Sequence, residues 1–341
     1  MSYPKTSVII VNYNGGTVLE KCLLSVGEII YPIWELIIVD NGSTDNFEST
    51  IHKYKKNFSN IKIIRNETNK GFAPANNQGV KVATGKYILL LNNDTVVPKN
   101  LLSVMVEKMK RDETIGAMQP KIFIMDKPGF LDNAGSFITK IGFLVHWGYD
   151  QKDGKEFMKE REVFTGKGAC LMIRKEVVDN VGLFDEDFVS YFEDSDFCWR
   201  VWLSGRRVIF FPKISIRHKV GYTNKRIDVL EVNFNSIKNR ISSLYKNLNL
   251  GNLFLILVPH IIILLILSLY YLVKFQFNKA LMIWRAVGWN LMHLKSLEAN
   301  RTKAQKMRRV SDNYIFNKVG TSFDIIGMLS HFKKVEANFK K

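Results

Sequence analysis

Cysteine is scarce in this chain, and no disulfide framework can be built from it. The 341 residues include only Cys22, Cys170 and Cys198, an odd number at wide spacing. Such spacing fits neither a small secreted domain nor the ligand set of a zinc site, so we expect reduced thiols in a cytosolic setting. A signal peptide is not expected either, because the first apolar run, Ser7–Val11, is short and polar residues follow it at once.

Three sequence motifs of nucleotide and hydrolase chemistry are missing as well. No G-x-x-x-x-G-K-[ST] loop indicates a P-loop nucleotidase, and no G-x-G-x-x-G follows the first predicted strand as in a dinucleotide-binding domain. No G-x-S-x-G elbow supplies a hydrolase serine. Apolar residues make up 46% of the chain and aromatic residues 12%, which excludes wholesale disorder and predicts a full core.

Acidic residues are few relative to basic ones, and the excess of positive charge is concentrated toward the C-terminus. Of the net charge of +17, residues 274–341 carry 14 Lys and Arg against 4 Asp and Glu, or +10. A basic region of this kind binds nucleic acid or an anionic membrane surface. The membrane is favoured, because Leu253–Val273 contains no Asp, Glu, Lys or Arg over 21 positions, just enough to span a bilayer.

The apolar segment Leu253–Val273 also fits an interfacial or re-entrant helix, or a buried core helix. A full span would have Lys238, Arg240 and Lys246 before it and the basic region after it, which conflicts with the positive-inside rule. Pro259 is expected to break the helix into a hairpin. A nucleic-acid-binding protein would instead need basic residues interleaved with exposed aromatics on the folded domain.

Four short apolar runs in the first hundred residues predict strands of a parallel sheet. They are Val8–Val11, Leu36–Val39, Ile61–Ile64 and Tyr87–Leu91. Each run is continuous rather than alternating, as in strands covered on both faces, and the stretches between them are long enough for helical crossovers. The predicted helices of this part are Thr17–Val26, Ala75–Ala83 and Asn100–Lys110.

Polar residues follow three of these strands directly. They are Asn12–Asn14 after the first strand, Asp40–Asp45 after the second and Asn92–Asp94 after the fourth. Ligands of open α/β sheets bind beyond the carboxyl ends of the strands, so three polar clusters at one edge predict a single site. Taken one by one, each cluster is equally explained as a turn or a helix cap.

After residue 112 the pattern changes. Strands are expected at Phe164–Ile173 and Arg207–Phe211, and a helix at Glu193–Leu203. A basic amphipathic stretch covers Asn233–Leu248, and Ala286–Arg309 is predicted to be a further helical, basic stretch.

Two acidic clusters are candidates for catalytic chemistry. Asp94 ends the first, and one carboxylate suffices for a divalent cation that also binds phosphate oxygens and water. The second has six acids within residues 185–196, including Glu193 and Asp194 at a predicted helix N-terminus. Its aromatic neighbours can raise a carboxylate pKa enough for a general base, although helix capping is the ordinary alternative. His218 stands alone and is by itself more typical of packing or of the surface.

Five motifs in order resemble the family 2 glycosyltransferases, most closely the bacterial rhamnosyltransferase-like branch. They are Ser7–Asn14, Ile38–Asp45, Asn69–Gly79, Leu91–Asp94 and Tyr191–Asp196. The resemblance implies a GT-A fold, an α/β architecture with a mainly parallel, Rossmann-like sheet flanked by helices. It also implies a nucleotide-sugar donor, a divalent metal (Mg²⁺ or Mn²⁺) and inversion at the anomeric carbon.

The resemblance implies which residues bind the donor and the metal. Asp40 would bind the pyrimidine base, and Asp94, the last acid of the family's D-x-D motif, would hold the metal together with His218. Asn92 replaces the first acid of that motif, which weakens the case for strict metal dependence. The full set of expected donor contacts is Val11, Asn12, Asp40, Asn69, Lys70, Asn93 and Asp94.

The resemblance also implies the base. Asp194 matches the second residue of the family's Glu-Asp pair, which is the proposed base, and Glu193 is its catalytic partner. Asp196 and Tyr191 are expected to orient the base or to contact the acceptor.

The function expected from the sequence is an inverting glycosyltransferase of bacterial polysaccharide biosynthesis. It would move a sugar, best matched by rhamnose from dTDP-rhamnose, to a hydroxyl of a lipid-linked or cell-surface glycan. A UDP-hexose or UDP-N-acetylhexosamine donor and a catalytically inactive binding module are the alternatives.

Two regions and a location are expected for this enzyme. Residues 1–225 would form the catalytic domain, and residues 226–341 a helical, basic, membrane-associating region. The partners would be a polyprenyl-diphosphate-linked or other glycan acceptor and an anionic membrane surface, with no nucleic acid. The enzyme would lie at the cytoplasmic face of the cell membrane as a peripheral, monotopic or single-span protein.

Overall fold

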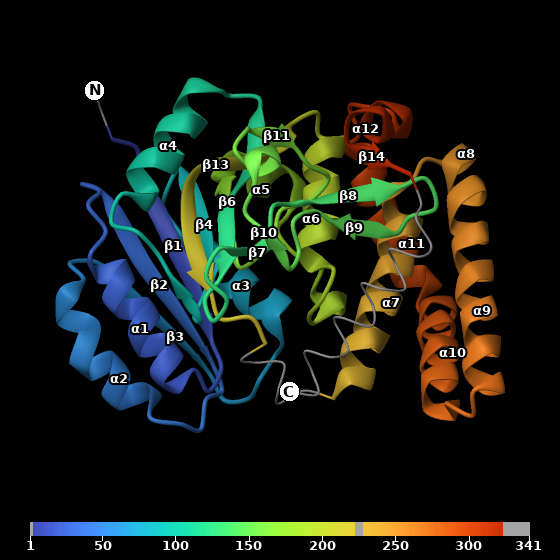
Figure 1. Cartoon of the computed structure of the whole chain (residues 1–341), viewed down its shortest axis with the longest axis horizontal. Coiled ribbons are helices and arrows are strands. Elements are labelled where there is room, and N and C mark those ends of the chain that lie inside the picture. The colour runs from blue at the N-terminus through green and yellow to red at the C-terminus, as the bar shows by residue number, and fades with distance from the viewer. Residues whose placement is uncertain (1–2, 222–227, 323–341) are drawn as a thin grey trace.

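A central mixed sheet with helices packed around it forms most of the structure, and further helices from the C-terminal part lie beside it (Figure 1). This computed structural model describes residues 3–221 and 228–322. The sheet has the strand order β10-β7-β6-β12-β4-β1-β2-β3, and β13 pairs with β5, β6 and β11. The strands of this sheet are β1 (Thr6–Asn12), β2 (Trp34–Asn41), β3 (Ile61–Asn66), β4 (Tyr87–Asn92), β5 (Thr95–Val96), β6 (Ile115–Ile124), β7 (Phe130–Asn133), β10 (Gln151–Lys152), β11 (Arg161–Glu162), β12 (Cys170–Arg174) and β13 (Arg207–His218).

The four strands predicted in the first hundred residues are confirmed as β1 to β4, and all four run parallel. Successive residues of β1 enter different cores, since Ile9 packs on one face of the sheet while Val8 and Ile10 pack on the other. Both faces are therefore buried, which explains the continuous apolar runs. The carboxyl ends of β1, β2 and β4 consequently meet at one edge.

The helices predicted in this part are also confirmed, with α3 beginning three residues earlier than expected, at Phe72. The helices up to residue 203 are α1 (Gly16–Gly27), α2 (Phe47–Tyr54), α3 (Phe72–Lys81), α4 (Leu101–Arg111), α5 (Lys175–Val181) and α6 (Glu193–Leu203), with short 3₁₀ turns at Lys55–Asn57, Lys155–Phe157 and Glu186–Phe188. Helix α6 has the bounds predicted from the sequence.

The strand expected at Phe164–Ile173 is wrong in its first half. Only Cys170–Arg174 forms a strand, β12, because Gly166 and Gly168 interrupt the preceding residues and leave them as a loop. The loop brings the backbone of residues 165–168 to the edge of the sheet. Strand β13 instead continues seven residues past the predicted end at Phe211, to His218.

Helices dominate the part of the chain that follows residue 228. They are α7 (Val229–Asn247), α8 (Leu250–Asn252), a π-helical turn (Leu253–Leu257), α9 (Val258–Val273), α10 (Phe277–Met292), α11 (Leu294–Lys306) and α12 (Asp312–Val319). The helical stretch predicted at Ala286–Arg309 is thus divided at His293 between α10 and α11. A small second sheet contains β8 (Ser136–Thr139), β9 (Leu144–His146) and β14 (Gly320–Thr321). Because β14 pairs with β8, the chain returns to the first half of the molecule after α12.

The chain does not turn back at Pro259, contrary to the expectation from sequence. The helix continues from Leu250 to Val273, and the π-helical turn before Pro259 absorbs the missing backbone donor and the ring. The reversal comes instead at residues 274–276, where Phe275 adopts a positive φ of 55°. Helices α9 and α10 then lie side by side as a hairpin (Figure 1).

Candidate active site

The polar residues that end β1, β2 and β4 meet as the sequence predicted. Asn93 donates a hydrogen bond to Asn12 Oδ1 at 2.7 Å, and Asn12 in turn donates to Ser43 Oγ at 3.0 Å and to Asp40 Oδ1 at 3.3 Å. Asn12, Asp40 and Asn93 are all buried. Val11 lies directly before Asn12 in β1. These strand ends form a connected polar floor.

The loop with Asn69 and Lys70 is fixed to the same edge by Asn41, a residue that the sequence did not single out. Asn41 donates to Asn69 Oδ1 at 2.8 Å and to the Gly71 carbonyl at 3.0 Å, and its own Oδ1 accepts from the Lys70 backbone at 3.1 Å. The Lys70 side chain is exposed. It is therefore free to reach a bound molecule above the strand ends.

Asp94 and His218 are brought together by strand register. In the antiparallel pairing of β13 with β5, His218 lies opposite Thr95, so its ring meets the preceding Asp94. The distance from His218 Nε2 to Asp94 Oδ1 is 3.1 Å. Both side chains are buried.

Asp132 and Lys167 complete this group, and no sequence motif pointed to either. Asp132 Oδ2 lies 2.8 Å from His218 Nδ1, and Lys167 Nζ contacts the two Asp132 oxygens at 2.8 and 2.7 Å. Burial opposes protonation of His218, but the Asp94 and Asp132 carboxylates outweigh it and raise the pKa of the imidazole to about 9. Burial of Asp132 is likewise outweighed by Lys167 and His218, which lower the pKa of its carboxyl group.

Asp94 and His218 fit a divalent cation. Asp94 Oδ1 is buried and receives no hydrogen bond from any residue between 3 and 322 that the structure describes, although His218 Nε2 faces it. Carboxylate oxygen and imidazole nitrogen are ligands that Mn²⁺ and Mg²⁺ accept. The Asp132 contact fixes the ring through Nδ1, and an ion at Nε2 would replace the proton that the raised pKa keeps there. No group of three or more acidic, His or Cys side chains forms a metal site within the described ranges. Phosphate oxygens and water would therefore supply the remaining ligands.

Glu193 and Asp194 begin helix α6 and differ in their partners. Asp194 Oδ2 accepts a hydrogen bond from the Gly168 backbone at 3.0 Å, and Oδ1 accepts one from Ser195 Oγ at 3.1 Å. Glu193 Oε2 is buried without a hydrogen-bond partner among the described residues. Burial raises the pKa of both carboxyl groups, and that of Glu193 further because Asp194 lies beside it. Asp194 therefore has two hydrogen-bond donors that favour its charged form, whereas Glu193 Oε2 has none among the described residues.

Two adjacent loop residues, Lys167 and Gly168, connect the Asp94–His218 pair to Asp194. Lys167 holds Asp132 behind His218, and the next residue, Gly168, donates its backbone hydrogen to Asp194. This loop is the segment that the sequence assigned to a strand. The site thus has two acidic parts, one around Asp94 and one around Asp194, and Lys167–Gly168 contacts both.

Asp196 is directed elsewhere, contrary to the acceptor contact expected from sequence. Its carboxylate is fully buried between α6 and α7, where it pairs with Arg200 at 2.9 Å and Lys246 at 3.0 Å. Ser243 and Asn247 of α7 donate to its other oxygen. The side chain has no oxygen left for a sugar hydroxyl, so its role is to join two helices.

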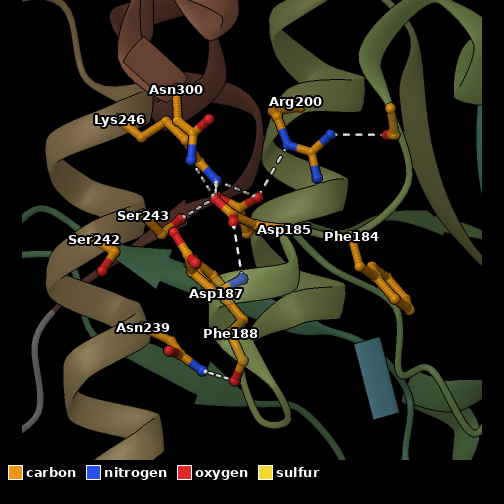
Figure 2. Close-up of polar contacts among 12 residues, drawn as sticks. Phe184, Asp185, Asp187, Phe188, Arg200, Asn239, Ser242, Ser243, Lys246 and Asn300 are labelled. Carbon is orange, nitrogen blue, oxygen red and sulfur yellow. Dashed lines mark hydrogen bonds and ion pairs between the residues drawn. The ribbon is translucent and has the colours of Figure 1, made fainter. Parts of the chain in front are cut away.

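Helix α7 also holds the loop that leads into α6, as Figure 2 shows. Lys246 donates to Asp185 at 2.7 Å and Asn300 donates to it at 3.3 Å, while Asn239 points at the backbone of Phe188. Asn239 donates to the Phe188, Ser190 and Tyr191 carbonyls at 2.9, 3.0 and 2.5 Å.

The held loop has an unusual backbone. Val189, Tyr191 and Phe192 all have positive φ, which costs roughly 1–3 kcal/mol for each such residue. The carbonyl of Val189 accepts the backbone hydrogen of Ala73 at 2.9 Å, so the loop also contacts the segment after Asn69 and Lys70. Tyr191 is half-buried, and burial raises the pKa of its hydroxyl. An acceptor contact by Tyr191 stays a prediction.

Residues 7–182 match the profile of glycosyl transferase family 2, a range of more than half of the chain. The chain belongs to glycosyl transferase family 2. Asp194 and His218 lie beyond the matched residues of this family 2 glycosyltransferase, so their roles stay predictions.

Curated relatives of this glycosyltransferase are named as synthases of an N-acetylglucosamine polymer. The poly-beta-1,6-N-acetyl-D-glucosamine synthase of Staphylococcus epidermidis is 27% identical over 209 residues, which cover 61% of this chain and 48% of the relative. The synthase of the same name from Staphylococcus aureus strain COL is 30% identical over 202 residues, covering 59% and 46%. The chain spans about half the length of the curated relatives it matches.

Solved structures confirm the GT-A fold of this glycosyltransferase. S. aureus TarS residues 1–349, solved in complex with UDP-GlcNAc, superposes with a TM-score of 0.58 at 17% identity and 89% coverage of each chain. The mannosyltransferase PcManGT from Pyrobaculum calidifontis, in complex with GDP-Man and Mn²⁺, gives 0.52 at 17% identity and coverage of 85% and 88%. None of these four names contains rhamnose, so the rhamnosyltransferase-like branch is unsupported by them.

Proposed function

We propose that this enzyme transfers a sugar from a nucleoside diphosphate to an acceptor hydroxyl with inversion, and that Asp194 is the base. The observation that carries the proposal is the arrangement at Asp194. Its carboxylate is oriented by the Gly168 backbone, its pKa is raised, and the same loop reaches the Asp94–His218 pair through Lys167. A carboxylate with a raised pKa takes up a proton more readily near neutral pH.

The steps for the residues of this chain follow from that geometry. Asp194 removes the proton of the acceptor hydroxyl, whose oxygen attacks the anomeric carbon as the bond to the diphosphate breaks. Asp94 Oδ1 and His218 Nε2 would hold a divalent cation, which neutralises negative charge on the departing diphosphate. Glu193 would be the neighbour that shares the proton, since its Oε2 has no hydrogen-bond partner among the described residues and Asp194 has two.

The nucleoside end of the donor would lie over the strand ends. Asp40, fixed by Asn12, would bind the base, and the backbone at Val11 and Asn12 would shape the pocket. Asn69 and Lys70 would approach the phosphates from the loop that Asn41 holds. Asn93 contacts Asn12 and would help to position both the nucleoside and the phosphates.

The sugar is better matched by an N-acetylhexosamine than by rhamnose. The synthases similar to this chain are named for N-acetylglucosamine, and TarS was solved with UDP-GlcNAc. UDP-GlcNAc is therefore the first donor to test, with dTDP-rhamnose second. The acceptor would be a lipid-linked or cell-surface glycan at the cytoplasmic face of the membrane.

Donor-dependent thermal stabilisation tests the proposal. The purified protein is heated with UDP-GlcNAc, dTDP-rhamnose and other nucleotide sugars, with and without Mn²⁺ or Mg²⁺. Because a ligand that binds only the folded state raises the melting temperature, a metal-enhanced shift with one donor supports the site. The Asp94→Ala variant should lose the metal-dependent part of that shift. A folded protein that responds to no donor would instead be an inactive binding module.

A further inference from the structure

Helix α9 exposes a continuous apolar ridge to the outside of the molecule. Phe254, Val258, Ile262, Ile266, Leu269 and Val273 recur every three or four residues and have exposed fractions of 47% to 74%. Within the segment Leu250–Val273, an 18-residue window has a mean hydropathy of 2.7, and only 28% of that window is buried in the protein. Water is a poor solvent for such a ridge.

Two polar side chains of the same segment, His260 and Ser268, face inward. His260 contacts the Ile141 carbonyl at 2.8 Å, and Ser268 donates to the Ala280 carbonyl of α10 at 3.4 Å. Both are fully buried, as is Leu264 between them. Protein therefore encloses both side chains, and apart from Tyr270 the exposed face of α9 carries aliphatic side chains.

The two ends of the α9–α10 hairpin are fixed to the same body. Before it, α7 is bound to α6 through Lys246 and Asp196. After it, Arg301 of α11 donates to the Tyr245 and Leu248 carbonyls at the end of α7, and β14 pairs with β8. If α9 crossed a bilayer, α10 would have to cross back, but α10 contains Lys279 and Arg285.

The charges around the hairpin indicate whether lipid or a second copy of this chain covers the apolar ridge. Lys274, Arg285 and Lys295 are exposed beside the apolar surface, and residues 274–322 contain ten Lys and Arg against two Asp and Glu. Exposed aromatic rings lie among them, with Trp284 on α10 and Phe275 at the turn. Cations and aromatic rings beside an apolar ridge fit an anionic lipid leaflet, whereas a second copy of this chain would place like charges together.

We propose that α9 lies in the plane of one anionic leaflet with its ridge in the acyl region, and that the enzyme is monotopic rather than single-span. The inference refines the proposed membrane location and does not depend on the proposed chemistry. An amphipathic surface of this kind embeds to a depth of about 5–10 Å without crossing.

Cysteine labelling in membranes tests the topology. The three native cysteines are buried and burial raises the pKa of each thiol, so new cysteines stand out against them. Leu250→Cys and Lys274→Cys place a thiol at either end of the continuous helical segment Leu250–Val273. An impermeant maleimide should label both from the cytoplasmic face of inverted vesicles and neither from the outside of intact cells. Labelling of the two positions from opposite faces would overturn the proposal.

Vesicle binding tests the surface itself. The double variant Ile262→Asp/Ile266→Asp should weaken binding to phosphatidylglycerol vesicles at least about tenfold, whereas Ile30→Asp, an exposed isoleucine far from the hairpin, should not. Equal binding by all three proteins, or no binding by the wild type, would refute the surface. A change from dimer to monomer in the double variant without lipid would assign the ridge to a second copy instead. Donor-induced thermal shifts should be the same in all three, which separates this result from the proposed function.

Discussion

The two sides of helix α6 show how one acidic cluster serves two purposes. Asp194 and Asp196 are two positions apart, so their side chains point about 200° apart around the helix axis. Burial raises the pKa of Asp194, whereas for Asp196 the effect of burial is outweighed by Lys246 and Arg200, which lower its pKa to about 2. The presence of cations, rather than the depth of burial, decides which carboxylate can take up a proton.

The largest expected effect separates chemistry from stability at Asp194. The Asp194→Asn variant should lose about 10² to 10⁴-fold in turnover, because the amide cannot accept the acceptor proton. It should bind donor as the wild type does and be at least as stable, since it removes a partly buried charge that forms no ion pair with the described residues. Steady-state transfer rates, donor titration and thermal melts measure the three quantities. Transfer near the wild-type rate would exclude Asp194 as the base.

The opposite result is expected at Asp196. Asp196→Asn should lower the free energy of unfolding by about 3–5 kcal/mol, because Arg200 remains buried without its counter-charge and Lys246 keeps only Asp185. Asp179→Asn is a matched control, since its partner Lys175 lies on the surface, and should change stability by less than about 0.5 kcal/mol. Urea unfolding distinguishes the two. Equal losses would mean that the buried network has no special role.

A smaller effect is expected where α7 supports the loop before α6. Asn239→Ala leaves three loop carbonyls without their donor and should cost about 1–3 kcal/mol of stability. Turnover should fall more than donor affinity, because the loop sets the position of Asp194. Asn235→Ala on the same helix removes only a 3.4 Å contact within α7 and should leave turnover unchanged. Identical kinetics in both variants would confine Asn239 to a structural role.

The smallest effects concern pH and have opposite signs on the two sides of α6. The pKa of Asp196 lies near 2 in the folded state and at its ordinary 3.8 in the unfolded chain, so its contribution is complete above pH 4 and is lost as the pH falls toward 2. Asp196→Asn should lack this part of the acid-induced loss. For Asp194 the folded pKa is raised, so the wild type loses stability relative to Asp194→Asn as the pH rises. Urea midpoints from pH 2 to pH 8 test both signs.

The sequence predicted that the polar strand ends meet, because that arrangement is local. Each polar cluster directly follows an apolar run, and parallel strands place such clusters at one edge, as Asn12, Asp40 and Asn93 show. Asp94 and His218 were paired through family resemblance alone. Strand register explains their contact, and the register between β5 and β13 cannot be predicted from local sequence patterns.

The residues that orient the site were missed for the same reason. Asp132 and Lys167 act through contacts with His218 and with each other, and no sequence motif around them predicts these contacts. The loop at Gly168 was taken for a strand because its apolar neighbours dominate the pattern.

The expectation that the basic residues of α7 flank a membrane segment was wrong. Lys238, Arg240 and Lys246 counted as basic flanks of an apolar segment, but all three are buried in protein. They therefore do not contribute to a positive-inside comparison, and the objection to basic sequence on both sides disappears. Amphipathic spacing shows that a helix has a buried face, but it does not show that charged residues occupy it.

The pairing of β14 with β8 has a consequence for the order of synthesis. Gly320 and Thr321 pair with Ile138 and Thr139, strands that leave the ribosome far apart in time. The small sheet therefore stays incomplete until α9 and α10 have been made and have emerged. The nascent chain therefore exposes its apolar ridge before this sheet can close.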